Sequence, residues 1–258
     1  MPELAEVEWM VRGLRDRAQG CCLDSLEVHD ERLFSGDSSV AGVLQSVGRR
    51  AKYIRMDFEG FTLLLHPRMT GRLVWGLDQR ARAVFRFRGV EPISFVDPRR
   101  FGTLQRIASD EVELFFRDKK LGDEPWPERR DGGWWKKRLG DRRIPIKNAL
   151  MRQDLVAGLG NIAAIEICWR IGVDPRTRAS DLGLEAWEDL GTAVWEHLGV
   201  TLSDIGGALE LVGEGGDNGF RIYGRGGEPC PRCSAAIERF MQSGRGTYWC
   251  PMCQGENA

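Results

Sequence analysis

The sequence lacks any apolar run of the roughly 18–20 residues that a membrane-spanning helix needs. It also lacks a basic, apolar leader, since it opens with Met1-Pro2-Glu3. We therefore expect neither a secretory signal nor a membrane segment, and a cytoplasmic location. No internal repeat of 20–50 residues is present, so a solenoid or a propeller is not expected.

Net charge is almost absent as well, because 37 Lys and Arg stand against 38 Asp and Glu, giving −1. Taken as one number, this argues against a nucleic-acid-binding protein, which is usually basic overall. The charge is unevenly distributed, however: residues 1–40 sum to −5, 41–180 to +11, 181–220 to −9 and 221–258 to +2. A local basic surface for nucleic acid is therefore compatible with the neutral average.

The composition, 42% hydrophobic and 29% charged over 258 residues, is that of a folded chain with one or two cores. Apolar residues at steps of three and four predict a helix over residues 3–19, ended by Gly20. Short β-type runs follow at Leu23–Val28, Tyr53–Phe58, Phe61–His66, Ala83–Phe87, Ile93–Val96 and Gly102–Ile107. Helical segments are predicted near 110–118, 133–139, 147–156, 160–171, 182–199 and 201–212.

A glycine-rich segment, 213–229, separates the helical part from a cysteine-containing end. Its seven glycines in seventeen positions predict a flexible loop. The predicted fold class is α+β: an N-terminal helix with a β-sandwich, a helical domain, and a small metal module. We place the domain limits at 2–109, 110–222 and 223–258.

Four cysteines form two matched pairs, Cys230-x2-Cys233 and Cys250-x2-Cys253, separated by sixteen residues. This spacing is typical of one tetrahedral Zn²⁺ held by four thiolates, and such a site is structural because no coordination position stays open. The alternative is four unrelated buried thiols. The remaining cysteines, Cys21, Cys22 and Cys168, are interpreted as small buried apolar residues. Arg239 and Arg245 lie between the pairs, either as an exposed charged turn or as phosphate contacts.

A proline at position two permits removal of Met1, which would leave a secondary amine with a pKa near 7.7–8.0. Such an amine can attack an electrophilic sugar carbon and form an iminium, in the manner of lysine Schiff bases. Glu3 and Glu6 follow on one face of the first helical turn. The alternative interpretation is a proline that opens a helix with acidic first-turn residues.

Six motifs occur in a fixed order along the chain. They are Pro2-Glu3-Leu4-Ala5-Glu6-Val7-Glu8, Arg50-Ala51-Lys52-Tyr53, His66-Pro67-Arg68-Met69-Thr70-Gly71, Asp97-Pro98-Arg99-Arg100-Phe101-Gly102, Gly158-Leu159-Gly160-Asn161-Ile162 and Tyr223-Gly224-Arg225-Gly226-Gly227-Glu228-Pro229-Cys230. Together with the zinc spacing, they resemble the formamidopyrimidine-DNA glycosylase family, within the Fpg/Nei superfamily, over residues 2–253.

This resemblance implies a bifunctional glycosylase and AP lyase that excises oxidised purines from double-stranded DNA and cuts the strand by β,δ-elimination. It implies a set of roles: Pro2 as nucleophile, Glu3 as acid/base, Glu6 as its support, Lys52 and Arg245 as phosphate ligands that assist elimination, and Asn161 as a phosphate ligand in a helix–two-turns–helix motif. The expected partners are DNA with oxidised bases or abasic sites, and the expected state is a monomer.

A flipped-out nucleotide leaves a hole in the duplex. By resemblance, Met69 fills it, Phe101 wedges between bases, and Arg99 pairs with the orphaned base. An apolar wedge beside an arginine suits a protein that kinks DNA, whereas the alternative is that Met69 and Phe101 are core residues. Further expected DNA contacts in the basic stretch are His66, Arg82 and Lys147, with Arg49, Arg50 and Arg152 as candidates that are otherwise simply solvated.

Four residues depart from the family pattern: Ala5, Pro67, Arg68 and Ala163. Arg68 adds a charge beside the filling residue, and the lesion-capping part of the family corresponds to Gly213–Arg221. Leu4 and the filling set favour the Fpg branch. Two alternatives stay open: a Nei-like glycosylase for oxidised pyrimidines, and a non-catalytic damaged-DNA-binding protein, which would follow if Met1 were retained.

Overall fold

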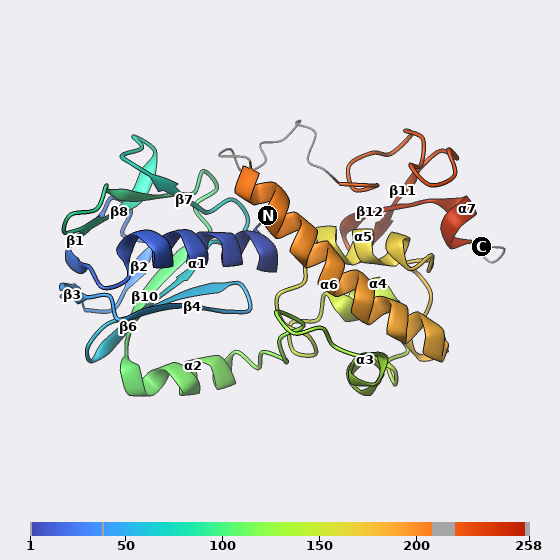
Figure 1. Cartoon of the computed structure of the whole chain (residues 1–258), viewed down its shortest axis with the longest axis horizontal. Coiled ribbons are helices and arrows are strands. Elements are labelled where there is room, and N and C mark those ends of the chain that lie inside the picture. The colour runs from blue at the N-terminus through green and yellow to red at the C-terminus, as the bar shows by residue number, and fades with distance from the viewer. Residues whose placement is uncertain (1, 38, 208–219, 256–258) are drawn as a thin grey trace. The chain divides into compact units, whose positions relative to one another are not determined.

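The computed structural model describes residues 2–37, 39–207 and 220–255 and divides into two compact units, residues 1–120 and 121–258 (Figure 1). Each unit has its own core and is treated by itself below. Among the described residues, no helix is both long enough and apolar enough to cross a membrane.

Two five-stranded sheets form the first unit, with strand orders β3-β1-β8-β9-β7 and β2-β10-β6-β5-β4. Neighbouring strands are antiparallel apart from the parallel pair β10 and β2. The strands are β1 Cys22–Val28, β2 Phe34–Ser35, β3 Gly42–Val43, β4 Ser46–Arg50, β5 Tyr53–Asp57, β6 Phe61–His66, β7 Arg72–Trp75, β8 Ala81–Phe87, β9 Ile93–Val96 and β10 Thr103–Ala108. A short turn of 3-10 helix, Ser109–Glu111, and α2 (Val112–Asp118) follow. The predicted β-sandwich is confirmed.

The first helix, α1 (Leu4–Ala18), contacts the edge strand of each sheet. The Met10 Sδ atom accepts a hydrogen bond from the Leu73 N–H in β7, and the Arg15 guanidinium donates to the Val47 carbonyl in β4. Its apolar face joins both sheets in one core. The N-terminal residues therefore start from a rigid, buried helix.

Six strands agree with the runs predicted from sequence, and β6 and β9 agree in both limits. The sequence missed β4 and β7, as well as the two-residue strands β2 and β3. In β4 only Val47 is buried, and β7 has four residues, so neither shows a clear apolar alternation. Pairing with neighbours, rather than local pattern, determines these strands.

The second unit begins with helices α3 (Gly132–Leu139), α4 (Ile146–Leu150), α5 (Asn161–Arg170) and α6 (Leu184–Gly207), with a 3-10 turn at Ala179–Asp181. The predicted helix over 147–156 is wrong beyond residue 150, where hydrogen-bonded turns replace it. The segments 182–199 and 201–212 were expected as two helices, but α6 runs unbroken to 207, and 208–212 lie outside the described residues. An interior glycine such as Gly199 weakens a helix by about 1 kcal/mol, too little to end this one.

The C-terminal part is a hairpin, β11 (Glu238–Gln242) with β12 (Arg245–Trp249), followed by α7 (Pro251–Gln254). Its two-residue turn, Ser243-Gly244, has φ angles of 49° and 74°, as a tight hairpin turn requires. Ile165 and Trp169 of α5 pack against Ile237 and two of the paired cysteines. The hairpin module thus shares a core with α5 within the second unit, and the three-domain division stays a prediction. Of the glycine-rich segment, 213–219 lie outside the described residues.

Candidate nucleic-acid interface

The first turn of α1 fixes the acidic pair predicted from sequence. Glu3 is the N-cap residue, 4% exposed, and a Glu6 carboxylate oxygen accepts a hydrogen bond from the Glu3 N–H at 2.9 Å. Burial, followed by the charge of Glu3, raises the pKa of Glu6 above its ordinary value. Pro2 lies directly before this pair and is partly buried. The arrangement places Pro2 next to a buried carboxyl group.

Lys52 lies in the two-residue turn between β4 and β5, where Ala51 has a φ of 52°. The next residue, Tyr53, packs edge-on against the ring of His66, with centroids 4.5 Å apart. Burial, then the charges of Arg68 and Lys52, lowers the pKa of His66 to about 3. The His66 Nδ1 atom accepts from the Arg68 N–H at 3.0 Å, so the neutral ring carries its proton on Nε2. We call Lys52, Tyr53, His66 and Arg68 the His66 corner. It presents hydrogen-bond donors and positive charge.

A buried carboxylate ties together two turns, 66–71 and 97–102. Asp97 accepts hydrogen bonds from the Thr70 hydroxyl and, at 2.7 Å, from the Gly102 N–H. The Thr70 oxygen also accepts from the Arg99 N–H at 3.2 Å. A Cβ at Gly102 would lie 2.7 Å from the Phe95 ring, so glycine is needed there. We call Thr70, Arg82, Asp97 and Gly102 the Asp97 junction.

The two tied turns present the residues that the resemblance assigns to filling the duplex. Met69 is 38% exposed and Phe101 is 52% exposed, so neither is a core residue. The Arg99 guanidinium lies 4.9 Å from the centre of the Phe101 ring. Two exposed apolar side chains therefore lie on turns that are held by buried hydrogen bonds.

Arg82, predicted to contact DNA, is 4% exposed and lies inside the Asp97 junction. Its guanidinium donates to Asp97 at 3.0 Å and to Asp30 at 3.0 Å. A buried guanidinium shared by two carboxylates is not available to a phosphate. We therefore assign Arg82 to positioning Asp97. Among the other candidates, Arg49 pairs with Glu8 and Arg152 pairs with Asp154.

In the second unit, α5 and the β11–β12 hairpin bring together Asn161 and Arg245. Asn161 begins α5, and its side-chain amide donates to the Gly246 carbonyl at 3.1 Å. Arg245 precedes Gly246 and is exposed. The Asn161 Oδ1 atom is buried and has no hydrogen-bond partner within the described part of the chain. Two of the predicted phosphate ligands thus share one site.

Lys147 of α4 is fully buried, which sequence did not predict. Its ammonium donates to the Thr247 hydroxyl at 2.8 Å, and burial, with the charge of Arg245, lowers its pKa to about 8. This position does not support a direct DNA contact. Lys147 instead fixes β12 beside Arg245.

Sequence analysis missed Glu166, a buried carboxylate in α5. It accepts backbone N–H bonds from Arg221, Ile222 and Tyr223 at 2.8–3.0 Å. These residues follow the segment 208–219. The available signal was a lone acidic residue in an otherwise apolar helical stretch. Gln153 has a similar role before α5, where it bonds the backbone of Gly158 and Leu159.

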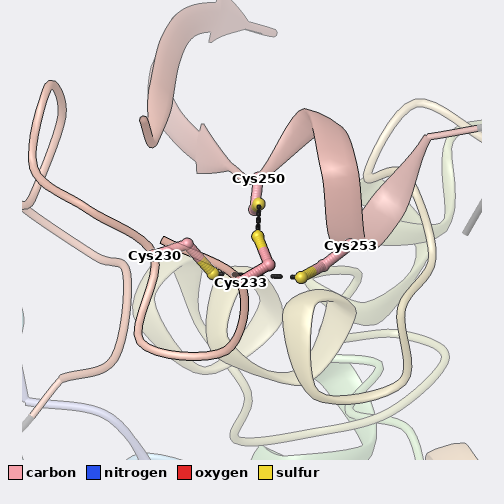
Figure 2. A group of neighbouring side chains, drawn as sticks. All are labelled: Cys230, Cys233, Cys250 and Cys253. Atoms are coloured by element: carbon pink, nitrogen blue, oxygen red, sulfur yellow. Dashed lines mark hydrogen bonds between the residues drawn. The ribbon is translucent and has the colours of Figure 1, made fainter. Parts of the chain in front are cut away.

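The four paired cysteines converge at the end of the hairpin (Figure 2). Their sulfur atoms all lie within 4.8 Å of one another, with 3.9 Å between Cys230 and Cys253 and 3.4 Å between Cys233 and Cys250. Zinc–thiolate bonds of about 2.3 Å in a tetrahedron separate sulfurs by about 3.8 Å, so the donor set fits one zinc ion. The Trp169 indole N–H donates to the Cys230 sulfur at 3.4 Å, which orients that ligand.

Comparison with known proteins matches three families along the chain. The "Formamidopyrimidine-DNA glycosylase N-terminal domain" matches residues 1–104, the "Formamidopyrimidine-DNA glycosylase H2TH domain" matches 121–210, and the "Zinc finger found in FPG and IleRS" matches 227–255. A formamidopyrimidine-DNA glycosylase of Streptococcus pneumoniae is 32% identical over 278 residues, covering 98% of this chain and 99% of the relative.

Solved structures give the same result. A complex of Lactococcus lactis Fpg with DNA that contains an abasic site superposes with a TM-score of 0.88 at 30% identity, covering 98% of this chain and all of that one. MutM bound to DNA that contains carbocyclic 8-oxo-G gives 0.86 at 32% identity, covering 99% of this chain and all of that one.

A β-sandwich that begins with a buried acidic helix, together with a helical unit that ends in a zinc finger, defines a base-excision-repair DNA glycosylase. The matches over the full chain identify the family within this class. The chain belongs to the formamidopyrimidine-DNA glycosylase family, whose members combine glycosylase and AP lyase activity, and it holds one structural zinc ion.

Proposed function

We propose that the chain excises oxidised purines, 8-oxoguanine and formamidopyrimidines, from duplex DNA and cuts the strand by β,δ-elimination through an iminium at Pro2. The observation that carries this proposal is the position of Pro2 directly before the Glu3–Glu6 pair on a buried helix. It is supported by relatives solved with abasic and 8-oxo-G DNA.

In the first step, with Met1 removed, the Pro2 nitrogen bonds to the sugar C1′ while the bond from C1′ to the base nitrogen breaks. The Pro2 nitrogen passes its proton to the departing base, and a proton from the Glu3 carboxyl group goes to the sugar ring oxygen as the ring opens and the iminium forms. Transfer of a C2′ proton to the Glu3 carboxylate then expels the 3′ phosphate, and transfer of a C4′ proton to water expels the 5′ phosphate. Water finally hydrolyses the iminium and frees Pro2.

Glu6 supports this step by holding the Glu3 backbone at 2.9 Å. Because its pKa is raised, Glu6 takes a proton more readily than an exposed glutamate does. Glu3 is the acid/base group.

Met69, Phe101 and Arg99 hold the duplex open around the flipped nucleotide. The Asp97 junction supports this role because it fixes both turns on buried hydrogen bonds. Arg99 is kept beside the Phe101 wedge, where its guanidinium can reach the orphaned base. An unstacked step stabilised by an inserted apolar side chain is how such proteins kink DNA.

Lys52 and His66 in one unit bind DNA phosphates, as do Arg245 and Asn161 in the other. Zinc bound by the four cysteines would fix the β11–β12 hairpin, which carries Arg245. Lys147 holds β12 through its hydrogen bond to Thr247. We further propose that the protein acts as a monomer on the bacterial chromosome, in the cytoplasm.

The test is a panel of three duplexes, with 8-oxoguanine opposite cytosine, an oxidised pyrimidine, or an abasic site. Denaturing gels, with and without alkali, separate base excision from β- and β,δ-elimination. We expect excision of 8-oxoguanine well above that of the pyrimidine, and incision of the abasic strand.

Two variants sharpen the test. Glu3→Gln should lose base excision while retaining DNA binding, whereas Arg88→Gln, an exposed residue paired with Asp24, should match the wild type. Faster excision of the pyrimidine would favour the Nei-like alternative. Binding without excision or incision on any duplex would favour the non-catalytic one.

A further inference from the structure

The turn 66–71 contains an arginine in a backbone conformation that suits glycine. Arg68 has a φ of 59°, and its N–H donates to the His66 Nδ1 atom at 3.0 Å. The turn is closed by the Gly71 N–H on the Pro67 carbonyl. A side chain with a Cβ is strained in the left-handed region, and glycine is not. Retained strain of this kind points to a use for the side chain.

The fold itself does not use the Arg68 side chain. Arg68 is exposed, and its guanidinium has no hydrogen bond or ion pair within residues 2–37, 39–207 and 220–255. Arg100, which has a φ of 57° in the other filling turn, differs in this respect because its guanidinium lies 3.9 Å from Asp30. Arg100 therefore has a carboxylate nearby, whereas the Arg68 guanidinium has none within the part of the chain that the structure describes.

Several positive charges act on His66. Lys52, Arg68 and Lys119 all act on His66, and each of them favours the neutral imidazole. Tyr53 packs against His66, and burial raises the pKa of its hydroxyl group. The charge of Arg68 opposes that rise. An added anion would be attracted to the positive charges near His66.

The hydrogen-bonding groups of this corner are donors. The Lys52 ammonium and the Arg68 guanidinium are donors. The His66 Nδ1 atom already accepts a hydrogen bond, which leaves the Nε2–H of the ring as a donor. An anion with several oxygen atoms, set close to two cations, matches this set. A DNA phosphate is such a group, and guanidinium forks bind it in a bidentate manner.

We propose that Arg68 binds a DNA backbone phosphate, as a third ligand beside Lys52 and His66. This inference rests on the proposed function, since it presumes that DNA is the ligand. Met69, the next residue, is 38% exposed on the same turn, so the phosphate contact and the filling side chain are placed by one backbone. Arg68 then contributes to affinity without reading the base.

The experiment compares the wild type with Arg68→Gly, Arg68→Lys and Arg88→Gln. Each is titrated with an 8-oxoguanine duplex and an undamaged duplex at several salt concentrations, using fluorescence anisotropy. Arg68→Gly relieves the backbone strain, so its thermal midpoint should be equal to or above that of the wild type. The slope of log Kd against log salt should fall by about 0.9, the value for one lost phosphate contact, on both duplexes.

Arg68→Lys should keep most of that slope, because an ammonium can still neutralise a phosphate. The Arg88→Gln control removes a charge that is paired with Asp24 and should leave the slope unchanged. An unchanged slope in Arg68→Gly, or a change confined to the 8-oxoguanine duplex, would overturn the inference. If the wild type binds neither duplex, the proposed function itself fails, and the two failures are thus distinct.

Discussion

Replacing Asp97 with asparagine tests whether the Asp97 junction holds the two filling turns in place. The change keeps the shape of the side chain and removes its charge. Asp97 is 2% exposed and accepts from Arg82, Thr70 and Gly102. An asparagine retains one acceptor oxygen and turns an NH₂ group toward a donor, so one side of the junction loses its bonds.

The magnitude follows from these contacts. A hydrogen bond to a charged group contributes about 1.5–3 kcal/mol, and breaking a buried ion pair costs about 3–5 kcal/mol. Arg82 keeps its second partner, Asp30, at 3.0 Å, which places the expected loss near the lower limit. We expect Asp97→Asn to lower the free energy of unfolding by about 3 kcal/mol. The control Thr70→Val, which removes one hydroxyl group, should lower it by about 1–2 kcal/mol.

Urea unfolding of the full chain, monitored by hydrogen exchange with mass spectrometry, measures the loss and locates it. Peptides that cover 66–71 and 97–102 should lose protection first in Asp97→Asn, while those of α5 should not change. The 8-oxoguanine duplex should also bind more weakly. A loss below about 1 kcal/mol, with both turns still protected, would refute the role of the junction.

The remaining predictions concern three other carboxyl and thiol groups. The pKa of Glu6 is raised in the folded state, so its ionised form destabilises the fold above that pKa. Glu6→Gln should therefore raise the thermal midpoint at pH 7, and this gain should vanish toward pH 4. A gain that grows on acidification would contradict the prediction. Glu166→Gln should lower the free energy of unfolding by about 2–3 kcal/mol and expose the amides of 221–223 to hydrogen exchange. Unchanged protection of these amides would show that the Glu166 carboxylate is not needed to hold them. Cys250→Ser should lose zinc, by metal analysis, together with DNA affinity, and retention of both is the opposing result.

Local pattern predicted those parts of the fold whose residues carry their own periodicity. The apolar face of α1, the strand β6 and the cysteine spacing are of this kind. It failed for β4 and β7, whose positions depend on pairing, and for α4, which ends at residue 150 because the chain forms bonded turns there. A continuous α6 was missed because a single glycine looks like a boundary in sequence.

The sequence indicated which residue types lie near the candidate site more reliably than it indicated which of them are exposed. Met69 and Phe101 lie on the surface, as a filling role requires. Arg82 and Lys147 were expected to meet DNA and are buried, because a sequence shows a charge without showing its partner, here Asp97 and Thr247. Arg68 was noted for its charge, whereas its left-handed backbone became visible only in three dimensions.

The most direct test of the central claim is to locate the covalent intermediate. The protein is incubated with a duplex that contains 8-oxoguanine opposite cytosine, reduced with borohydride, digested, and analysed by mass spectrometry, with the mature N-terminus sequenced in the same sample. The account predicts an adduct on the Pro2 nitrogen of chains that lack Met1, and none when that amine is blocked. An adduct on Lys52, or no adduct with the 8-oxoguanine duplex fully cut, would contradict it.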